Sequence, residues 1–356
     1  METPMYYHIH PKFKLNGFFI DKDDLKSIAY DFIKEGLTYQ AVIGDFIQEW
    51  LDEKDHVFVQ TSGSTGTPKQ IKIYKQQMVN SAVASGEFFG LVAGQKALLC
   101  LPVNYIAGKL MLVRAMVLGL DIDLVAPSSK PLQNNNTYYH FVAMIPLQVQ
   151  NSLSELVNVR KLIVGGASMN TTLKAKVQHL KTQIFETYGM TETVTHIAAK
   201  RINGTKEFAF TTLPNVSISI DERSCLKIEA PKVSSEIIQT NDIVELVSNH
   251  QFIWKGRFDN VINSGGVKLF PEQIEAKLSE IITENFFVTG MPDAILGEKL
   301  VLIIQIDHRQ KAIITKRIQD LSLLDKFEIP KEIICVEAFQ HTENGKINRK
   351  ATLSKL

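Results

Sequence analysis

The spacing of apolar residues predicts alternating helices and strands through the first half of the chain. Apolar side chains recur at helical intervals over Ser27–Leu51. Further helices are expected over residues 74–89, 109–118 and 171–180, and short apolar strands over residues 97–101, 123–126, 139–145 and 161–164. Strands that alternate with helices favour a largely parallel sheet covered on both faces.

The pattern changes after Thr193. Four short strand candidates follow one another with charged turns and no room for helices between them, at residues 216–220, 226–230, 236–240 and 243–247. They predict an antiparallel sheet or small barrel beside the parallel one. The remaining chain, with a helix opened by Pro271, is a compact α+β segment large enough to form its own domain. The fold class is therefore α/β, with a large N-terminal domain at 1–258 and a small C-terminal domain at 259–356.

Composition places the chain among ordinary globular proteins. It has 356 residues, 45% of them hydrophobic and 22% charged, and a formal net charge of +1. This balance gives no reason to expect a nucleic acid or an acidic membrane surface as partner. Three widely separated cysteines fit buried thiols in a reducing cytoplasm, without metal-ligand spacing. The N-terminus lacks a signal-peptide pattern, and no apolar run reaches the roughly 20 residues of a membrane span. A cytoplasmic location is expected.

The segment Thr61–Lys69 has the composition of a phosphate-binding loop. It reads Thr-Ser-Gly-Ser-Thr-Gly-Thr-Pro-Lys and lies between two short alternating apolar runs, which predict flanking strands. Its glycines permit backbone N–H groups to converge on an anion, and its hydroxyls and lysine supply further donors. It is not a Walker A loop, because it lacks the Gly-Lys-Ser/Thr ending. Taken alone, a polar surface hairpin explains it equally well.

Other segments are also ambiguous when each is considered alone. Glu192, after the turn at Tyr188–Thr191, has the position of a helix-capping carboxylate. Asn241-Asp242 has the composition of a plain turn, and Arg257 with Asp259 that of a surface ion pair.

In their order along the chain, these segments resemble the motifs of the adenylate-forming superfamily, which includes acyl- and aryl-CoA ligases, luciferases and the adenylation domains of peptide synthetases. The resemblance covers roughly Val57 to the end. It rests on Thr61–Lys69, Gly165-Gly166-Ala167, Tyr188–Glu192, Asp242, the Gly256–Asp259 region with Asn263–Gly266 and Pro271–Glu275, and Asn344–Arg349.

The resemblance implies two half-reactions, with ATP, Mg²⁺ and CoA as cofactors or co-substrates. Attack of a carboxylate on the α-phosphate of ATP would form an acyl-adenylate and release pyrophosphate, and a thiol would then displace AMP. Positive charge and donors must be placed in advance for the first step. The implied catalytic residues are Lys346, Thr191 and Lys69, with Glu192 as the ligand of Mg²⁺. The implied ATP-binding residues are Thr61, Ser62, Gly63, Ser64, Thr65, Gly66, Thr67, Lys69, Gly165, Gly166, Ala167, Tyr188, Gly189, Met190, Thr191, Asp242, Arg257 and Lys346.

The second half-reaction implies that the C-terminal domain moves. Asp259 is placed at the hinge, and Gly265, Gly266 and Lys268 are placed against CoA.

Within the superfamily, the chain is most similar to a short o-succinylbenzoate–CoA ligase of menaquinone biosynthesis. Residues 141–149 and Glu192–Ala198 carry this resemblance, together with Leu101-Pro102, Tyr105–Lys109 and Arg114. The acid substrate would be a small aryl or acyl carboxylic acid, with Tyr105, Ile106, Lys109, Met144, Thr195 and His196 near it. A second substrate carboxylate would need a cationic or donor-rich partner, for which His196, Lys109, Arg114 and Arg201 are candidates.

The chain also departs from the superfamily pattern. The phosphate loop comes early, so the chain is expected to lack much of the usual N-terminal region, and Asn241 replaces the glycine that the resemblance implies before Asp242. Two alternatives stay open: an enzyme that loads another acid onto CoA or a carrier-protein thiol, and a non-catalytic nucleotide-binding relative. A homodimer is possible.

Overall fold

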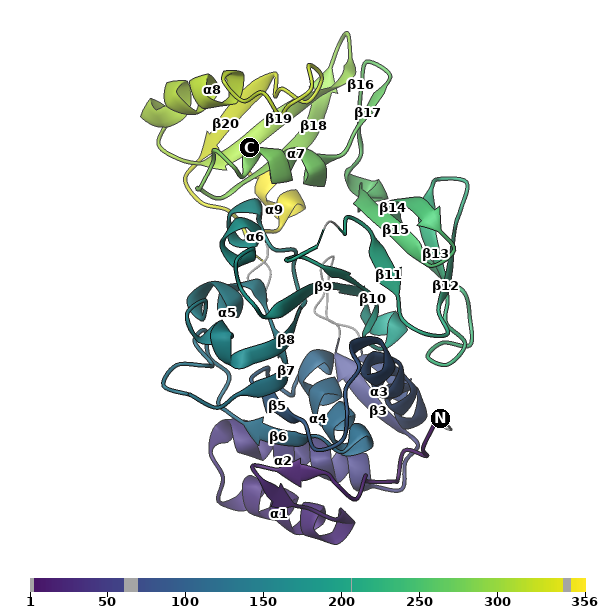
Figure 1. Cartoon of the computed structure of the whole chain (residues 1–356). Coiled ribbons are helices and arrows are strands. Elements are labelled where there is room, and N and C mark those ends of the chain that lie inside the picture. Colours follow the sequence, from purple (N-terminus) through teal and green to yellow (C-terminus); the bar gives the residue numbers. More distant parts are fainter. Residues whose placement is uncertain (1–2, 61–69, 206, 342–346) are drawn as a thin grey trace.

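The computed structural model describes residues 3–60, 70–205, 207–341 and 347–356. A 13-stranded sheet organises the first 257 residues, which we call the N-terminal unit (Figure 1). Parallel strands form its middle, in the order β9-β8-β7-β5-β6-β1. These strands are β1 (Lys14–Leu15), β5 (Lys96–Leu99), β6 (Asp121–Leu124), β7 (Tyr139–Met144), β8 (Val159–Val164) and β9 (Gln183–Gly189), and β2 (Phe18–Phe19) closes that edge.

Antiparallel strands extend the same sheet beyond β9, in the order β10-β11-β15-β14-β13-β12. They are β10 (His196–Arg201), β11 (Phe210–Thr212), β12 (Ser217–Ile220), β13 (Cys225–Glu229), β14 (Ile238–Ser248) and β15 (Gln251–Arg257). A separate hairpin of β3 (His56–Gln60) and β4 (Gln70–Tyr74) flanks the segment 61–69, so the predicted flanking strands are confirmed. The expected mixed α/β class is likewise confirmed, and the antiparallel strands are joined edge to edge with the parallel ones.

Helices cover both faces of the parallel strands, because the strands carry apolar side chains on each face. Residues such as Phe141 and Ile163 face the core formed with α1 (Lys22–Lys34), α2 (Thr38–Leu51), α3 (Lys75–Phe89) and α4 (Ile106–Leu118). Val142 and Leu162, on alternate positions, face the core formed with α5 (Pro146–Asn151), the short helix η1 (Glu155–Asn158) and α6 (Thr171–Val177).

Two predicted boundaries were wrong. The helical region at 27–51 is two helices separated at Glu35–Leu37, and they pack so closely that a Cβ on Gly44 would lie 2.6 Å from the carbonyl oxygen of Ala29. The strands expected at 236–240 and 243–247 form a single strand, β14. Asn241-Asp242 therefore lies inside a strand and is not a turn.

Residues 262–356, the C-terminal unit, form a second sheet with its own cores (Figure 1). Its strands are β16 (Ile262–Ser264), β17 (Val267–Leu269), β18 (Phe286–Asp293), β19 (Gly297–Gln305) and β20 (Glu332–Val336), and its helices are α7 (Pro271–Leu278), α8 (Lys311–Gln319) and α9 (Arg349–Leu353). The chain passes between the units through η3 (Phe258–Asn260), where the sequence places the domain boundary. The boundary itself stays a prediction.

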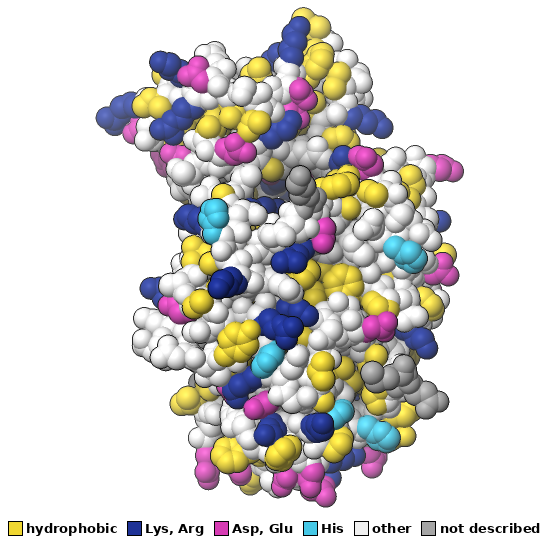
Figure 2. Space-filling model, in the orientation of Figure 1, with side chains coloured by type: hydrophobic (Ala, Val, Ile, Leu, Met, Phe, Trp, Pro, Cys, Tyr) yellow, Lys and Arg dark blue, Asp and Glu magenta, His cyan; other side chains and the backbone are white. Residues whose placement is uncertain are grey.

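Charged side chains of both signs are spread over the two units on the face shown in Figure 2. In the described ranges, no helix combines the length and the apolar character that crossing a membrane requires.

Candidate nucleotide and acid site

The carboxyl ends of β7, β8 and β9 bring the predicted motifs to one edge of the sheet. The three strands are parallel neighbours, with Met144 paired to Val164 and Val164 paired to Glu186. The segments that leave them are Ile145, Gly165-Gly166-Ala167 and Met190–Glu192. Ligands of open α/β sheets bind at this edge. The register of the strands therefore makes two of the predicted nucleotide motifs neighbours.

The turn at Gly165-Gly166 is held tightly against its neighbours. The N–H of Gly165 donates to the carbonyl oxygen of Met144 at 3.1 Å, and the Thr187 hydroxyl donates to the carbonyl oxygen of Val164 at 3.1 Å. A Cβ on Gly165 would lie 2.9 Å from that hydroxyl oxygen, and Gly166 has φ of 81°. Glycine is needed at both positions, at the first for space and at the second for backbone conformation.

The next segment, Met190–Thr195, is a turn tied together by one side chain. The Thr193 hydroxyl lies 3.0 Å from the N–H of Met190 and 2.6 Å from the carbonyl oxygen of Thr195. Val194 has φ of 65°, which is rare for a β-branched residue. Such strain costs on the order of 1–3 kcal/mol and persists where surrounding contacts enforce it, often at functional sites. The turn exposes the side chain of Glu192.

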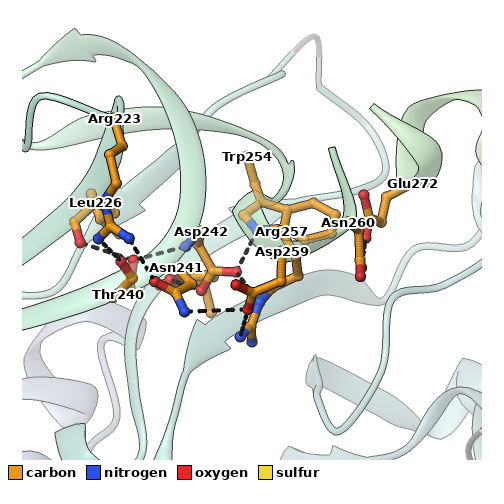
Figure 3. A network of polar contacts seen from close by, with 11 residues as sticks. Arg223, Leu226, Thr240, Asn241, Asp242, Trp254, Arg257, Asp259, Asn260 and Glu272 are labelled. Atoms are coloured by element: carbon orange, nitrogen blue, oxygen red, sulfur yellow. Dashed lines mark hydrogen bonds and ion pairs between the residues drawn. The ribbon is translucent and has the colours of Figure 1, made fainter. Parts of the chain in front are cut away.

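A buried carboxylate, Asp242, lies at the centre of a polar network between β9, β14 and β15 (Figure 3). The Tyr188 hydroxyl donates to its Oδ2 at 2.6 Å, and Trp254 Nε1 donates to its Oδ1 at 3.2 Å. Arg257 Nε lies 3.7 Å from Oδ1, because Asp242 and Arg257 are directly paired across β14 and β15. Burial, together with the charge of Asp242, raises the pKa of Tyr188, so the phenol stays a donor.

The network leaves acceptor capacity on Asp242. A carboxylate offers about four lone-pair positions, and the described residues make one hydrogen bond to each of its oxygens. Two hydroxyls could use the remaining positions. Of the donors that hold this carboxylate, Trp254 is absent from the sequence prediction. It reaches Asp242 because the pairing of β14 with β15 shifts register between Ile243 and Val244. The local sequence pattern does not predict this bulge.

The predicted acid side contains a buried arginine. Arg114, on α4, is fully buried, and its Nε donates to the Ser85 hydroxyl at 3.1 Å. Its guanidinium lies 5.3 Å from the ring centroid of Phe141, and its NH1 lies 3.1 Å from the sulfur of Met111. Among the described residues, no carboxylate forms an ion pair with it. Burial lowers the pKa of Arg114 to about 10, which leaves the side chain charged at neutral pH.

His196 lies beside this arginine. Its Nε2 is 3.4 Å from the Ser85 hydroxyl oxygen and its Nδ1 is 3.4 Å from the Thr195 hydroxyl oxygen. Burial and the charge of Arg114 lower the pKa of His196 to about 3. His196 and Thr193 also line a cavity of about 50 Å³ between α3 and β10. That volume holds a few water molecules, so we place no aromatic ring in it.

The neutral His196 predicts that stability falls as the pH is lowered. The ordinary pKa of histidine is 6.5, so below that pH His196 becomes protonated in the unfolded chain but stays neutral in the folded chain. The loss amounts to about 1.4 kcal/mol per pH unit below 6.5, or about 2 kcal/mol at pH 5. We expect His196→Gln to lose less stability than the wild-type protein between pH 7 and pH 5, measured by urea unfolding. Equal losses in the two proteins would show that His196 is not buried as a neutral ring.

The structure separates two residues from the predicted acid pocket. Met144 is buried among Val142, Leu162 and Val164, because its side chain points into the core with α5 and α6. Lys109 is buried on α4, where its Nζ forms an ion pair with Glu49 at 3.0 Å and lies 4.3 Å from the Phe46 ring. Each of these side chains is thus engaged elsewhere.

Three other residues predicted near the acid substrate differ in how far they are exposed and in whether they have a described polar partner. Tyr105, at the start of α4, is 46% exposed, and Ile106 is half-buried. Arg201, at the end of β10, has a buried Nε without a described hydrogen-bond partner. The sequence pattern does not predict Ser85. The feature that could have indicated it is a small hydroxyl side chain on the apolar face of α3.

The predicted CoA-side glycines have a local structural explanation. Gly265 and Gly266 form the two-residue turn between β16 and β17, with φ of 59° and 82°. A hairpin turn with both central residues at positive φ requires such residues whatever lies nearby. Lys268 is exposed on β17. Their contact with CoA stays a prediction.

The C-terminal motif begins outside the described residues but ends inside them. Arg349, on α9, forms an ion pair with Glu275 of α7 at 2.8 Å and donates to the carbonyl oxygen of Val288 at 3.2 Å. Asn348 donates its N–H to the carbonyl oxygen of Gln340 at 2.7 Å. The predicted Lys346 lies outside the described residues, and so does the predicted phosphate loop Thr61–Lys69.

The predicted magnesium ligand can be tested against its surroundings. Within the described ranges, no group of three or more His, Cys, Asp or Glu side chains is placed to hold a metal ion. A single exposed carboxylate, Glu192, fits an ion that takes most of its oxygen ligands from substrate phosphates and water, as Mg²⁺ commonly does.

Comparison with known proteins gives consistent results. Residues 20–234 match the AMP-binding enzyme family. The 2-succinylbenzoate–CoA ligase of Staphylococcus aureus strain MSSA476 is 24% identical, over 92% of this chain and 73% of that protein.

Two solved structures extend the comparison. An acyl-CoA synthetase (AMP-forming)/AMP-acid ligase II-like protein from Dyadobacter fermentans is 36% identical, with a TM-score of 0.62 over 93% of this chain and 98% of that one. The o-succinylbenzoate CoA synthetase of Bacillus subtilis, solved with its acyl-adenylate intermediate, is 18% identical, with a TM-score of 0.70 over 85% of this chain and 73% of that one. The family match and the Dyadobacter relative together show that this chain belongs to the AMP-binding enzyme family, whose members form adenylates.

Proposed function

We propose that the protein is an ATP-dependent acid–CoA ligase that acts on o-succinylbenzoate in two steps. The carboxylate is first adenylated with release of pyrophosphate, and CoA then forms the thioester with release of AMP. Support for the substrate comes from the Staphylococcus ligase and from the buried Arg114.

The nucleotide side of the proposal uses three groups of residues. Asp242, oriented by Tyr188 and Trp254, would accept hydrogen bonds from the ribose hydroxyls. The tight turn at Gly165-Gly166 would leave room for the adenine, and Thr191 would donate to the α-phosphate. Glu192 would hold Mg²⁺, which supplies positive charge to the phosphates when bound.

Three further residues complete the proposed first step. Lys69 and the remainder of the 61–69 segment would hold the β- and γ-phosphates. Lys346 would bridge the substrate carboxylate and the α-phosphate as charge moves between them. Arg257, 3.7 Å from Asp242, would lie close to the bound nucleotide.

Arg114 is the observation that favours a dicarboxylate. A buried charge is costly unless a charged or hydrogen-bonding partner compensates it. The described partners of Arg114 are a hydroxyl, a sulfur and an aromatic ring, all of them neutral. A second carboxylate of the substrate would supply the missing negative charge. o-Succinylbenzoate carries one carboxylate for adenylation and another for this contact.

Arg114→Met is expected to lower kcat/KM for o-succinylbenzoate about 30- to 5,000-fold, because truncating one partner of a buried charge pair costs about 2–5 kcal/mol. Methionine keeps most of the apolar stem of the arginine but lacks its charge. Turnover of benzoate, which has no second carboxylate, should fall much less. The measurement is a coupled assay of AMP release with each acid.

Arg160→Met provides a matched control, since Arg160 is exposed on β8. Arg160→Met should leave the turnover of both acids unchanged. If Arg114→Met lowers turnover of the two acids by the same factor, Arg114 does not recognise a second carboxylate. Unfolding of the variant should also be measured, because removing an unpaired buried charge is expected to preserve or raise stability.

The overall proposal is tested by incubating the protein with ATP, Mg²⁺ and a panel of aryl and fatty acids. CoA and a phosphopantetheine-bearing carrier protein are offered as alternative acceptors. We expect thioester formation with CoA and o-succinylbenzoate. Transfer to the carrier protein alone would show that CoA is not the acceptor. Turnover of other acids alone would show that o-succinylbenzoate is not the substrate, and absence of any AMP release would reject the catalytic function.

A further inference from the structure

The turn that joins the two units is held by side chains from both sides (Figure 3). It consists of Phe258, Asp259 and Asn260, between the last strand of the N-terminal unit and the first strand of the C-terminal unit. Asn260 Nδ2 donates to Glu272 Oε1 of α7 at 2.5 Å. The third residue of the turn is thus attached to the C-terminal unit.

The first two residues of the turn are attached to the N-terminal unit. Asn241 Nδ2 donates to Asp259 Oδ2 at 3.2 Å, and Arg257 NH2 lies 3.5 Å from the same oxygen. The guanidinium carbon of Arg223 lies 5.0 Å from the ring centroid of Phe258, within range of a cation–π contact.

Asn241 connects these contacts into one chain. Its Oδ1 accepts a hydrogen bond from Arg223 NH1 at 3.2 Å, while its Nδ2 donates to Asp259. Arg223 is fixed in turn by Asp221, whose Oδ2 lies 2.8 Å from Arg223 NH2. An amide can accept from one neighbour and donate to the other, which no apolar residue and no glycine can do. The family resemblance implies a glycine at the position of Asn241. The hydrogen bonds from Arg223 through Asn241 to Asp259 therefore depend on the asparagine of this chain.

We propose that Arg223 and Asn241 are positioning residues that clamp the turn at Phe258–Asp259 and thereby set the orientation of the C-terminal unit. The neighbouring residue of Asn241 is Asp242, the predicted ribose ligand, so the clamp joins the nucleotide side of the site to the turn between the units. Each contact is at least partly exposed and individually weak. A clamp of this kind restrains the orientation without making it permanent.

The orientation also depends on a second contact. The Thr171 hydroxyl, at the start of α6, donates to the carbonyl oxygen of Ala276 at 3.1 Å and lies 2.6 Å from the Ser279 hydroxyl oxygen. Both partners belong to α7 or its C-terminal end. Loss of the clamp should therefore widen the range of orientations while leaving this contact to limit it.

The test is a distance measurement between spin labels on the two units of the full-length protein. Labels are attached through Lys181→Cys in the N-terminal unit and Gln319→Cys in the C-terminal unit, both exposed positions. Cys100, Cys225 and Cys335 are buried, which limits unwanted labelling. Asn241→Gly and Arg223→Ala are then introduced separately and together, with Asn249→Ala and Arg160→Ala as exposed controls.

We expect each clamp variant to broaden the distance distribution by a similar amount, and the double variant to broaden it no further, since both residues act through one chain. The controls should match the wild-type protein. If both clamp variants keep the wild-type distribution, or if the two changes add independently, the proposal is wrong.

A kinetic readout distinguishes positioning from general destabilisation, and it rests on the proposed function. The ratio of the adenylation rate to the thioester-forming rate should change about two- to fivefold in the clamp variants, the scale expected of exposed contacts. Thermal unfolding should change little, and Arg223→Lys should restore part of the ratio by keeping a cation near Phe258. A broadened distance distribution without acid turnover would support the clamp and reject the proposed function. Normal turnover, with unchanged distances and an unchanged ratio of the two rates, would support the proposed function and reject the clamp.

Discussion

Asp242→Ala is expected to lower kcat/KM for ATP by at least about 10- to 100-fold and to abolish the preference for ATP over 2′-deoxy-ATP. Hydrogen bonds to a charged group contribute about 1.5–3 kcal/mol each, and the proposed ribose contact involves at least one. The carboxylate is buried and held by Tyr188 and Trp254, so its remaining acceptor positions are already oriented. The measurement compares the two nucleotides in the wild-type protein and the variant.

Two further variants make this test specific. Tyr188→Phe removes one group that orients the carboxylate and should cost about tenfold, the equivalent of one hydrogen bond. Glu245→Ala removes an exposed carboxylate from the same strand, β14, and should have no effect on nucleotide use. If Asp242→Ala still discriminates against 2′-deoxy-ATP as the wild-type protein does, Asp242 does not bind the ribose.

Asp242→Ala also tests stability, because the carboxylate satisfies two partly buried donors. Without it, the Tyr188 hydroxyl and the Trp254 N–H lose their partner, at a cost of about 1–3 kcal/mol for each unsatisfied group. Urea unfolding of the variant should therefore accompany the kinetics. Asp242→Asn keeps one acceptor oxygen, and we expect it to retain more stability than the alanine variant.

The sequence predicts the architecture well where local patterns carry the information. Apolar runs of three to five residues mark β5, β7 and β8, and Gly90 and Gly119 end α3 and α4 in the left-handed conformation that glycine favours. The break between α1 and α2 was missed, because apolar residues keep a helical spacing on both sides of it. The merging of two expected strands into β14 was missed because Asn241-Asp242 has the composition of a turn.

The site shows the same division. The motifs at Gly165, Tyr188 and Asp242 can be found from the order of segments, since each is local. Pairings between distant elements cannot be found in this way. The approach of Trp254 to Asp242 depends on a strand bulge, and the contact of Arg114 with Ser85 depends on how α3 packs on α4. The role of Asn241 as a link to Asp259 is likewise invisible until β14 is placed beside η3.

Lys346→Ala is expected to reduce adenylate formation by at least about 10²-fold, the effect typical of losing one donor that stabilises developing charge. The prediction comes from the sequence motif, since Lys346 lies outside the described residues. Adenylation is measured by ATP–pyrophosphate exchange with the acid present. Thioester formation from a supplied acyl-adenylate and CoA should stay close to the wild-type rate, because that step transfers an acyl group already activated.

The separation of the two half-reactions is what makes this prediction informative. Lys350→Ala, which removes an exposed lysine of α9, controls for a general change in charge near the C-terminus. It should leave both half-reactions unchanged. Loss of both half-reactions in Lys346→Ala would indicate a structural defect, whereas exchange at the wild-type rate would remove Lys346 from the catalytic residues. Loss of exchange alone would place the charge of this lysine in the first step, as expected for a residue that joins the carboxylate to the α-phosphate and is not needed once AMP is the leaving group.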